Sequence, residues 1–149
     1  MLRTLIVEDN IPFRKVFKSE LLSQFPSMEL IEAGSGEEAL NRLGSHPMDL
    51  VFMDIGLPGQ SGLEATKRIK ADYPDTTIAI LTSYESPEYK EAVIRCGASC
   101  FIRKDSFKWE EMFTFIRCFQ EAKLNGRKPN CIRFAGGKGH VGSDLNIKI

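Results

Sequence analysis

The chain has the size and composition of one globular domain with a short extension. Its 149 residues suffice for one full core but not for two, and its 42% hydrophobic and 27% charged residues are typical of an ordinary soluble protein. Residues 1–124 carry 15 Lys and Arg against 19 Asp and Glu, and residues 125–149 carry five against one, so an acidic body of charge −4 precedes a basic tail of charge +4. The body is therefore a poor surface for nucleic acid, and any such contact would fall to the tail or to a partner.

The cysteines and the N-terminus argue against several further classes of protein. The chain has no CxxC pair and no His cluster, which speaks against a zinc site or a redox dithiol formed by its four cysteines, Cys96, Cys100, Cys118 and Cys131. The first residues have no signal-peptide architecture, and no apolar stretch approaches the ~18 residues of a membrane span. We therefore expect reduced thiols in a cytoplasmic protein that makes no contact with a membrane.

A short strand and an amphipathic helix open the chain. Residues 4–7 are apolar in succession, which predicts a buried strand. Asn10 can cap the helix that follows, Pro12 suits its first turn, and Pro26 ends it. Apolar residues recur along this helix at helical spacing and predict one buried stripe of Phe13, Val16, Phe17 and Leu21.

The next part of the chain repeats this pattern twice. Residues 28–33 alternate in part, as an edge strand would, and Ser35 with Glu38 forms a capping box that opens a helix through about residue 43. Residues 50–54 are another apolar run, which ends in a carboxylate and is followed by a loop rich in Gly and Pro. A helix then begins at Gly62 and presents one face of Leu63, Thr66, Ile69 and Tyr73.

Two further strands complete the predicted sheet. Residues 77–81 and 99–103 are apolar runs of the same kind. Between them, residues 86–88 (Ser-Pro-Glu) have the order of a helix start, and Gly97 suits the C-terminal cap of that helix. Its buried stripe is predicted to contain Tyr89, Ala92, Val93 and Cys96.

A last helix, through about residue 124, is predicted to begin after a cap at Asp105 or Ser106. Its core-facing stripe would use Met112, Ile116 and Phe119, with Trp109 or Phe113 beside it. A neighbouring face is also apolar, and it contains Phe115, Cys118 and Ala122. We interpret this excess as a homodimer surface, the alternative being that the tail folds back over it.

The tail, residues 125–149, holds five of the twelve glycines and is predicted to be a flexible extension or a small added hairpin. Residues 136–139 are not a phosphate-binding loop, because the Walker pattern and a following helix are missing. The domain itself is predicted to occupy residues 1–124.

Five strands that alternate with five helices predict an α/β fold. Connections of this length suit adjacent parallel strands with right-handed crossovers, which gives a doubly wound five-stranded parallel sheet with helices on both faces. By precedent, the strand order is 2-1-3-4-5, as in flavodoxin-like folds, and the topological switch point lies between the first and third strands.

Polar side chains follow four of the five strands, at the edge where ligands bind in such sheets. They are Glu8, Asp9, Asp54, Thr82 and Lys104. Three carboxylates gathered there repel one another by roughly 3 kcal/mol per pair at ~5 Å and an effective dielectric of ~20. Either a proton is taken up or a cation is bound there, and among cations hard oxygen donors select Mg²⁺. The set therefore suits a carboxylate that attacks phosphorus, with Asp54, in the middle of the cluster, as the acceptor.

These residues resemble, in order and spacing, the receiver domain of two-component response regulators. The resemblance covers about residues 1–124 and rests on Glu8-Asp9, residues 53–59, Gly62, Thr82, and Gly97-Ala98-Ser99 leading to Lys104. Residues 97–105 are similar to the nitrate-response subfamily, whose members usually add a C-terminal helix-turn-helix. Residues 125–149 are too few to hold that DNA-binding domain.

The resemblance implies a role for each matching residue. Asp54 would accept a phosphoryl group from a sensor histidine kinase or a phosphotransfer protein, by self-catalysed transfer and with later autodephosphorylation, so the protein is not an enzyme in the ordinary sense. Glu8, Asp9, Asp54 and the backbone carbonyl of Gly56 would hold Mg²⁺, Asp9 more directly than Glu8. Lys104 would pair with the phosphate, and Thr82 and Phe101 would act as switch residues. An aromatic residue in a strand is more often part of the core, which is the alternative for Phe101.

Some features depart from the family pattern, and other functions stay open. Lys104 is followed by Asp105 where many receivers have Pro, and Gly56 provides no side chain near the phosphoacceptor. One alternative is an aspartyl-phosphate phosphatase of the haloacid-dehalogenase kind, although that chemistry needs an Asp where Gly56 stands. Another is a flavodoxin-like FMN binder, although the loop after the first strand is acidic. The chain could also be the receiver fragment of a DNA-binding transcriptional regulator.

Overall fold

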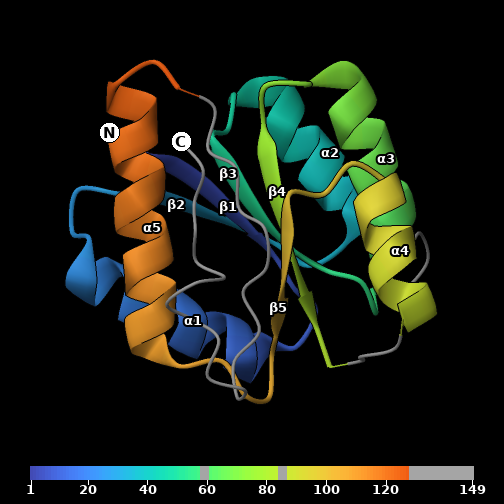
Figure 1. The fold of residues 1–149 in the computed structure, drawn as a ribbon, viewed down its shortest axis with the longest axis horizontal. Helices are drawn as coiled ribbons and strands as arrows, with labels where there is room; N and C mark the ends of the chain where they lie inside the picture. Colours follow the sequence, from blue (N-terminus) through green and yellow to red (C-terminus); the bar gives the residue numbers. More distant parts are fainter. Residues whose placement is uncertain (58–60, 84–86, 128–149) are drawn as a thin grey trace.

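The structure is a computed structural model that describes residues 1–57, 61–83 and 87–127. Five parallel strands form one sheet in the order β2-β1-β3-β4-β5, and helices cover both of its faces (Figure 1). This confirms the predicted fold and strand order. The elements, in chain order, are β1 (Arg3–Val7), α1 (Ile11–Gln24), β2 (Glu29–Ala33), α2 (Gly36–Ser45), β3 (Leu50–Asp54), α3 (Gly62–Asp72), β4 (Thr77–Thr82), α4 (Pro87–Arg95), β5 (Cys100–Arg103) and α5 (Trp109–Leu124).

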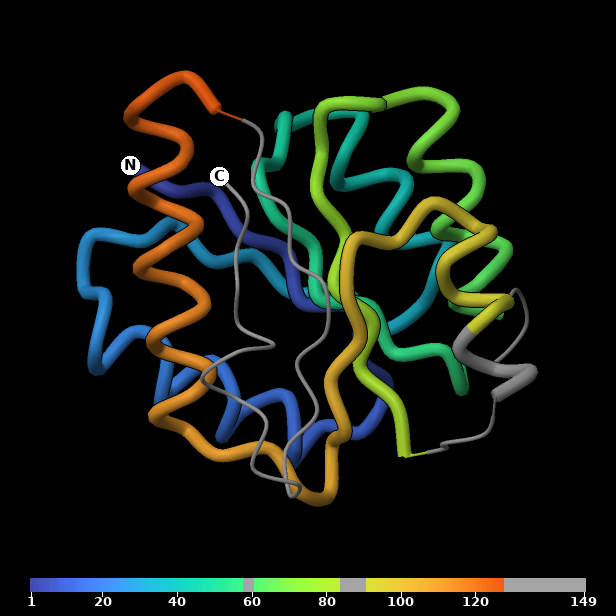
Figure 2. The backbone as a smooth tube through the Cα atoms, viewed as in Figure 1, coloured from blue at the N-terminus to red at the C-terminus, as the bar shows by residue number. Residues whose placement is uncertain are grey.

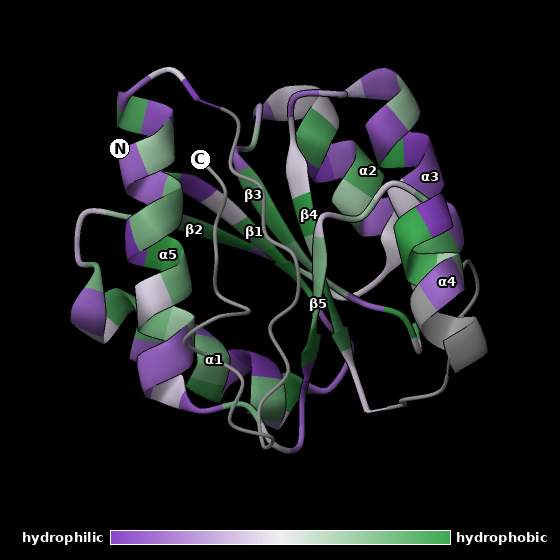
Figure 3. Cartoon of the chain, viewed as in Figure 1, coloured by the Kyte–Doolittle hydropathy of each residue, from purple (hydrophilic) through white to green (hydrophobic). Residues whose placement is uncertain are grey.

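Each face of the sheet has its own apolar core. Helices α1 and α5 pack on one face, where Phe17 and Phe119 join Phe52 of β3. Helices α2, α3 and α4 pack on the other, where Ile69 and Val93 join Met53 of the same strand. Every residue of β3 is buried because both of its faces are covered, which explains its continuous apolar sequence. The hydropathy colouring shows apolar strands between helices that have one polar side (Figure 3).

The crossovers bring all strand ends with the same polarity to one edge of the sheet. From each of the first four strands the chain enters a helix that returns beside the sheet to the start of the next (Figure 2). The β1–β3 register pairs Val7 with Met53, and the β3–β4 register pairs Asp54 with Leu81. The side chains just beyond these pairs therefore lie on one rim, as the sequence predicts.

Side-chain caps fix where three of the helices start. The predicted caps Asn10 and Ser35 accept hydrogen bonds from the amides of Phe13 and Glu38, at 3.0 and 3.1 Å. Ser61 caps α3 in the same way, accepting from the amide of Glu64 at 3.2 Å. The helix that carries Gly62 therefore begins directly after the loop that follows Asp54.

Two predictions about helices are wrong, one about a buried stripe and one about a cap. Val16 of α1 is 56% exposed, so it does not belong to the buried stripe of Phe17 and Leu21. Helix α5 starts at Trp109 after Lys108, with no side-chain cap. The carboxylate of Asp105 instead accepts hydrogen bonds from the Arg103 guanidinium at 3.2 and 3.0 Å, which keeps it from capping the helix.

The predicted partner face of α5 is largely part of the core. Phe115 and Ala122 are as fully buried as Met112, Ile116 and Phe119. The ring of Phe115 lies 6.4 Å from that of Phe52, and Phe113, on another side of the helix, lies 6.0 Å from Phe25. Because α5 packs both on the sheet and beside α1, the wide apolar arc is already used within the domain. The reason for expecting a homodimer surface there is thereby removed.

Several sequence predictions concern residues outside the described part of the chain. They are the Ser86 cap, the Tyr89 side chain, residues 58–60, Cys131 and most of the tail, from residue 128 onward. Within the described part, no helix is both long and apolar enough to span a membrane. Of the cysteines described there, Cys96 and Cys118 are free thiols.

Candidate functional site

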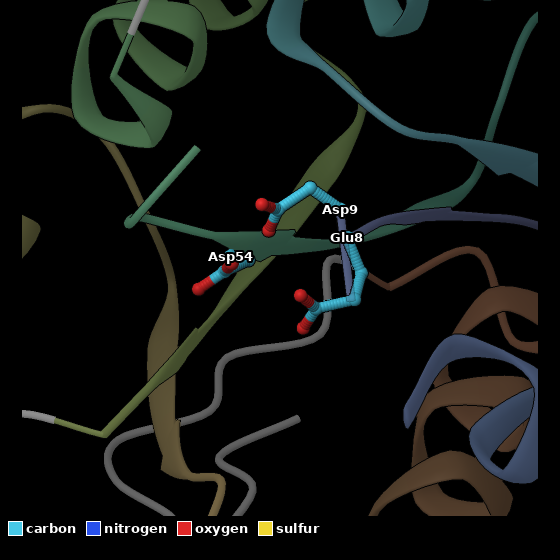
Figure 4. A group of neighbouring side chains, drawn as sticks. All are labelled: Glu8, Asp9 and Asp54. Atoms are coloured by element: carbon cyan, nitrogen blue, oxygen red, sulfur yellow. The ribbon is translucent and has the colours of Figure 1, made fainter. Parts of the chain in front are cut away.

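Three carboxylates meet at the rim where β1 and β3 end. One oxygen from each of Glu8, Asp9 and Asp54 lies within 4.8 Å of the others, and the three side chains face a common region (Figure 4). Glu8 is fully buried and Asp54 is 6% exposed, whereas Asp9 is open to solvent. The convergence predicted from the strand ends is therefore present.

Lys104, directly after β5, lies against two of these carboxylates. Its Nζ is 2.6 Å from Glu8 Oε1 and 3.9 Å from Asp54 Oδ1. The same ammonium lies 4.6 Å from the centroid of the Phe13 ring, a favourable position over an aromatic face. The Lys104 amide donates to the carbonyl of Thr82 at 2.8 Å, which extends the β4–β5 pairing up to the lysine. The sheet thus holds the ammonium above the acidic cluster.

The electrostatics of Glu8 reflect its burial. Burial raises the pKa of Glu8, and the Asp54 charge acts in the same direction, while the contacts with Lys104 and with the Asn10 amide oppose the rise without cancelling it. Glu8 Oε2 accepts a hydrogen bond from the Asn10 amide at 3.0 Å, whereas the buried Oε1 forms an ion pair with Lys104 but accepts no hydrogen bond from the described residues. Glu8 therefore holds Lys104 by an ion pair, while its Oε1 keeps hydrogen-bonding capacity that the described residues do not use.

The donor set fits a hard divalent cation. Three carboxylates face one ammonium, which leaves an excess of negative charge. Asp9 is exposed and Asp54 is close to it, so a cation there would keep solvent ligands, as Mg²⁺ usually does. Asp9 and Asp54 would therefore hold the ion most directly, with Gly56 close by.

The two predicted switch residues are both buried, but they lie in different parts of the domain. Thr82 is 1% exposed at the end of β4, one residue beyond the register partner of Asp54, so it lies at the rim. Phe101 is 6% exposed and packs in the core on the α2–α4 face of the sheet, near Val93. The structure thus gives Phe101 a core position, and its switch role stays a prediction.

With this geometry in view, comparison with known proteins identifies the family. Residues 4–117 match the family model described as the response regulator receiver domain. The chain belongs to this family. It is a receiver domain of two-component systems.

Individual relatives are similar over most of the chain. The oxygen regulatory protein NreC of Staphylococcus carnosus is 37% identical over 107 residues, 70% of this chain and 49% of NreC. A LuxR-family two-component response regulator from Aurantimonas has a TM-score of 0.72 at 26% identity, covering 96% of this chain and 94% of that structure. The response regulator TrrA of Thermotoga maritima, solved in complex with Mg²⁺ and BeF, has a TM-score of 0.68 at 35% identity, covering 78% of this chain and 97% of that structure. The chain spans about half the length of the curated relatives it matches.

Two glycines shape the loop that follows the phosphoacceptor candidate of the receiver domain. The Gly56 amide donates to Asp54 Oδ1 at 3.3 Å, and a Cβ at Gly56 would meet that oxygen at an ordinary 3.9 Å. At Gly62, by contrast, a Cβ would lie 2.2 Å from the Asp54 carbonyl oxygen and 2.5 Å from Ile55 Cα. Gly62 is therefore required by the close approach of α3 to the end of β3.

Sequence reasoning did not anticipate the part that Arg14 of α1 plays in the receiver domain. Its Nη1 donates to the backbone carbonyl of Glu8 at 2.7 Å, and its Nε donates to Glu32 Oε1 at 2.8 Å. Lys18 donates to the other Glu32 oxygen at 3.0 Å. The sequence does show a basic residue, Arg14, one turn into the helix that follows Glu8 and Asp9. It does not reveal that the partner of this residue is Glu32 on β2.

This ion-pair group makes the stability of the receiver domain depend on pH. Burial acts to raise the pKa of Glu32, but the hydrogen bonds from Lys18 and Arg14 outweigh it, so that pKa lies below its ordinary value of 4.5. The pairing therefore stabilises the folded state above about pH 4.5 and loses this effect as the pH falls through the native pKa. We expect Glu32→Gln to lower the free energy of unfolding by about 1 kcal/mol at pH 7. In urea titrations this difference should shrink below pH 4, and a difference independent of pH would contradict the assignment.

Proposed function

We propose that the protein is a phosphorylation-dependent signalling switch in which Asp54 accepts the phosphoryl group. The observation that carries this proposal is the position of Asp54. Its nearly buried carboxylate ends β3, shares one rim with Glu8 and Asp9, and lies 3.9 Å from Lys104 Nζ. A nucleophilic carboxylate, a cation site and a fixed ammonium are the groups that phosphoryl transfer to a carboxylate requires.

Each residue has a defined part in the proposed transfer. An Asp54 oxygen forms a bond to phosphorus while the bond from phosphorus to the donor's leaving atom breaks. Bound Mg²⁺, held by Asp9 and Asp54 with Glu8 and the Gly56 carbonyl beside it, would supply charge neutralisation at the phosphoryl oxygens. Lys104 now pairs with Glu8, and the added phosphoryl charge would draw its ammonium toward Asp54. The Thr82 hydroxyl would donate a hydrogen bond to an oxygen of the phosphoryl group.

The readout would be a change of partner affinity. If Thr82 and Lys104 move inward, the rim after β4 and the neighbouring face of α4 repack, and Phe101 is the aromatic residue of β5 that would follow. The donor is a histidine kinase or a phosphotransfer protein in the cytoplasm. The relative TrrA was solved in complex with Mg²⁺ and BeF, which supports the binding of a divalent cation by this chain as well. A homodimer through α5 stays a prediction without an apolar face to support it.

The phosphatase and the FMN-binding alternatives are less well supported. A phosphatase of the haloacid-dehalogenase kind needs an acidic side chain two residues after the nucleophile, and Gly56 stands there. An FMN-binding protein needs a phosphate loop after β1, and the chain has Glu8 and Asp9 there. Membership of the receiver family favours the switch over both.

Phosphorylation of Asp54 can be tested by mass spectrometry of the intact chain. Incubation with Mg²⁺ and acetyl phosphate should add one phosphoryl mass, and Asp54→Asn should abolish the adduct because the amide is not a nucleophile. Asp49→Asn is the matched control, because Asp49 lies at the opposite end of β3, where it pairs with Lys123 at 3.1 Å, and should leave the adduct unchanged. The proposal fails if the wild-type chain gains no adduct, and turnover of a phosphoester substrate would favour the phosphatase instead.

A further inference from the structure

Arg14 joins the acidic turn after β1 to the edge strand β2. Its planar guanidinium spans two acceptors, the carbonyl of Glu8 just after β1 and the carboxylate of Glu32 on β2. The side chains of Arg14 and Glu32 are only 17% and 19% exposed. Charge-assisted hydrogen bonds of this length in a partly buried place fix the guanidinium in one orientation.

The Glu8 carbonyl belongs to the peptide group that links Glu8 to Asp9. The amide of Glu8 donates to the Ala33 carbonyl at 2.9 Å, and the β1–β2 register ends with the pair of Val7 and Ala33. Beyond that pair the ladder no longer orients the chain, and the bond from Arg14 Nη1 holds the next peptide plane. The orientation of this plane determines where the Asp9 side chain leaves the backbone.

We propose that Arg14 is a positioning residue that holds Asp9 in the geometry needed to bind the divalent cation. The inference rests on the proposed function, because it assigns Arg14 a part in the same site. Arg14 contacts a backbone carbonyl and a distant carboxylate, so it acts through Asp9 and is not itself a catalytic residue. Groups that orient metal ligands in this way typically change metal affinity 10- to 100-fold when they are removed.

Lys18 provides a comparison within the same helix. It lies one turn after Arg14 and donates to the same carboxylate of Glu32, at 3.0 Å, but among the described residues Glu32 is its only acceptor. Removing Lys18 therefore weakens the ion-pair group without releasing the Glu8 carbonyl. A purely structural role for Arg14 predicts similar effects of the two substitutions, whereas a positioning role predicts different effects on the cation.

The test measures the Mg²⁺ dissociation constant of the full chain from amide shifts in ¹⁵N NMR titrations, beside urea denaturation of each variant. We expect Arg14→Met to raise the dissociation constant roughly tenfold and Lys18→Met to change it by less than about twofold. Arg14→Lys should restore the charge and the stability but not the affinity, because a lysine ammonium lacks the planar fork of donors with which the guanidinium orients the Glu8 carbonyl. This conservative variant keeps the test decisive if Arg14→Met does not fold.

The outcomes separate this inference from the proposed function. If the wild-type chain binds Mg²⁺ and Arg14→Lys binds it equally well, Arg14 has no positioning role although the proposed site stands. Equal losses of affinity in the Arg14 and Lys18 variants would also overturn the inference, because they would assign the effect to the ion-pair group as a whole. A wild-type chain that binds no Mg²⁺ overturns the proposed function, and this inference with it.

Discussion

Replacing Lys104 by Met should lower the free energy of unfolding by about 3 kcal/mol at neutral pH, because it leaves the buried Glu8 carboxylate without its cation. Glu8 is fully buried, and its Oε1 lies 2.6 Å from the ammonium that would be lost. Burial already raises the pKa of Glu8 in the presence of Lys104, and Lys104 opposes that rise. Removing the lysine therefore destabilises the buried carboxylate further. The measurement is urea denaturation followed by the fluorescence of Trp109, the single tryptophan.

A double-mutant cycle separates this cause from lost packing of the lysine stem. Glu8→Gln removes the buried charge, so Lys104→Met added to Glu8→Gln should cost less than about 1 kcal/mol. Lys123→Met is the matched control, since Lys123 is 41% exposed in a surface pair with Asp49, and it should cost at most about 1 kcal/mol. If the two single substitutions at Glu8 and Lys104 have additive effects, the ion pair does not contribute as the structure indicates. Lys104→Met should also uncouple Asp54 phosphorylation from any change of conformation.

The acidic cluster was predictable because it depends on local sequence and on one rule of topology. An apolar run such as β3 is recognisable by itself, and parallel strands bring their carboxyl ends to one rim. Asp54 ends β3, Lys104 follows β5 directly and Asp9 is the second residue after β1, so their convergence needed no knowledge of packing. The strand order, by contrast, rested on precedent, and the register pairs now establish it.

The surfaces of the helices were less predictable because their burial depends on neighbours far away in the sequence. The periodicity of α5 identifies apolar positions, but it does not reveal that Phe115 meets Phe52 while Phe113 meets Phe25. A helix in contact with both a sheet and another helix buries a wider arc than one contact requires. The same reasoning applies to Arg14, whose two acceptors lie just after β1 and on β2. Contacts of this kind depend on how the helices and strands pack against one another, which the local sequence does not specify.

Gly62→Ala should lower the free energy of unfolding by about 3 kcal/mol and slow phosphorylation of Asp54 by roughly 100-fold. The added methyl would lie 2.2 Å from the Asp54 carbonyl oxygen and 2.5 Å from Ile55 Cα, which are backbone atoms and cannot rotate away. Either α3 moves off the sheet or the end of β3 shifts, and the second displaces the nucleophile itself. The Gly62 amide, which donates to the Ile55 carbonyl at 3.3 Å, would lose that bond in both cases.

Gly44→Ala tests whether the effect comes from this close approach and not from glycine as such. Gly44 is an exposed residue of α2, and a Cβ there would have Tyr73 Oη as its nearest neighbour at 3.9 Å. Because Ala is a better helix former than Gly, this substitution should raise the free energy of unfolding by about 0.5 kcal/mol and leave the rate of adduct formation unchanged. A Gly62→Ala variant as stable and as reactive as Gly44→Ala would mean that α3 does not press against the strand that carries Asp54. The loop between them would then be free to reposition the carboxylate, and the fixed geometry on which the proposed transfer depends would be lost.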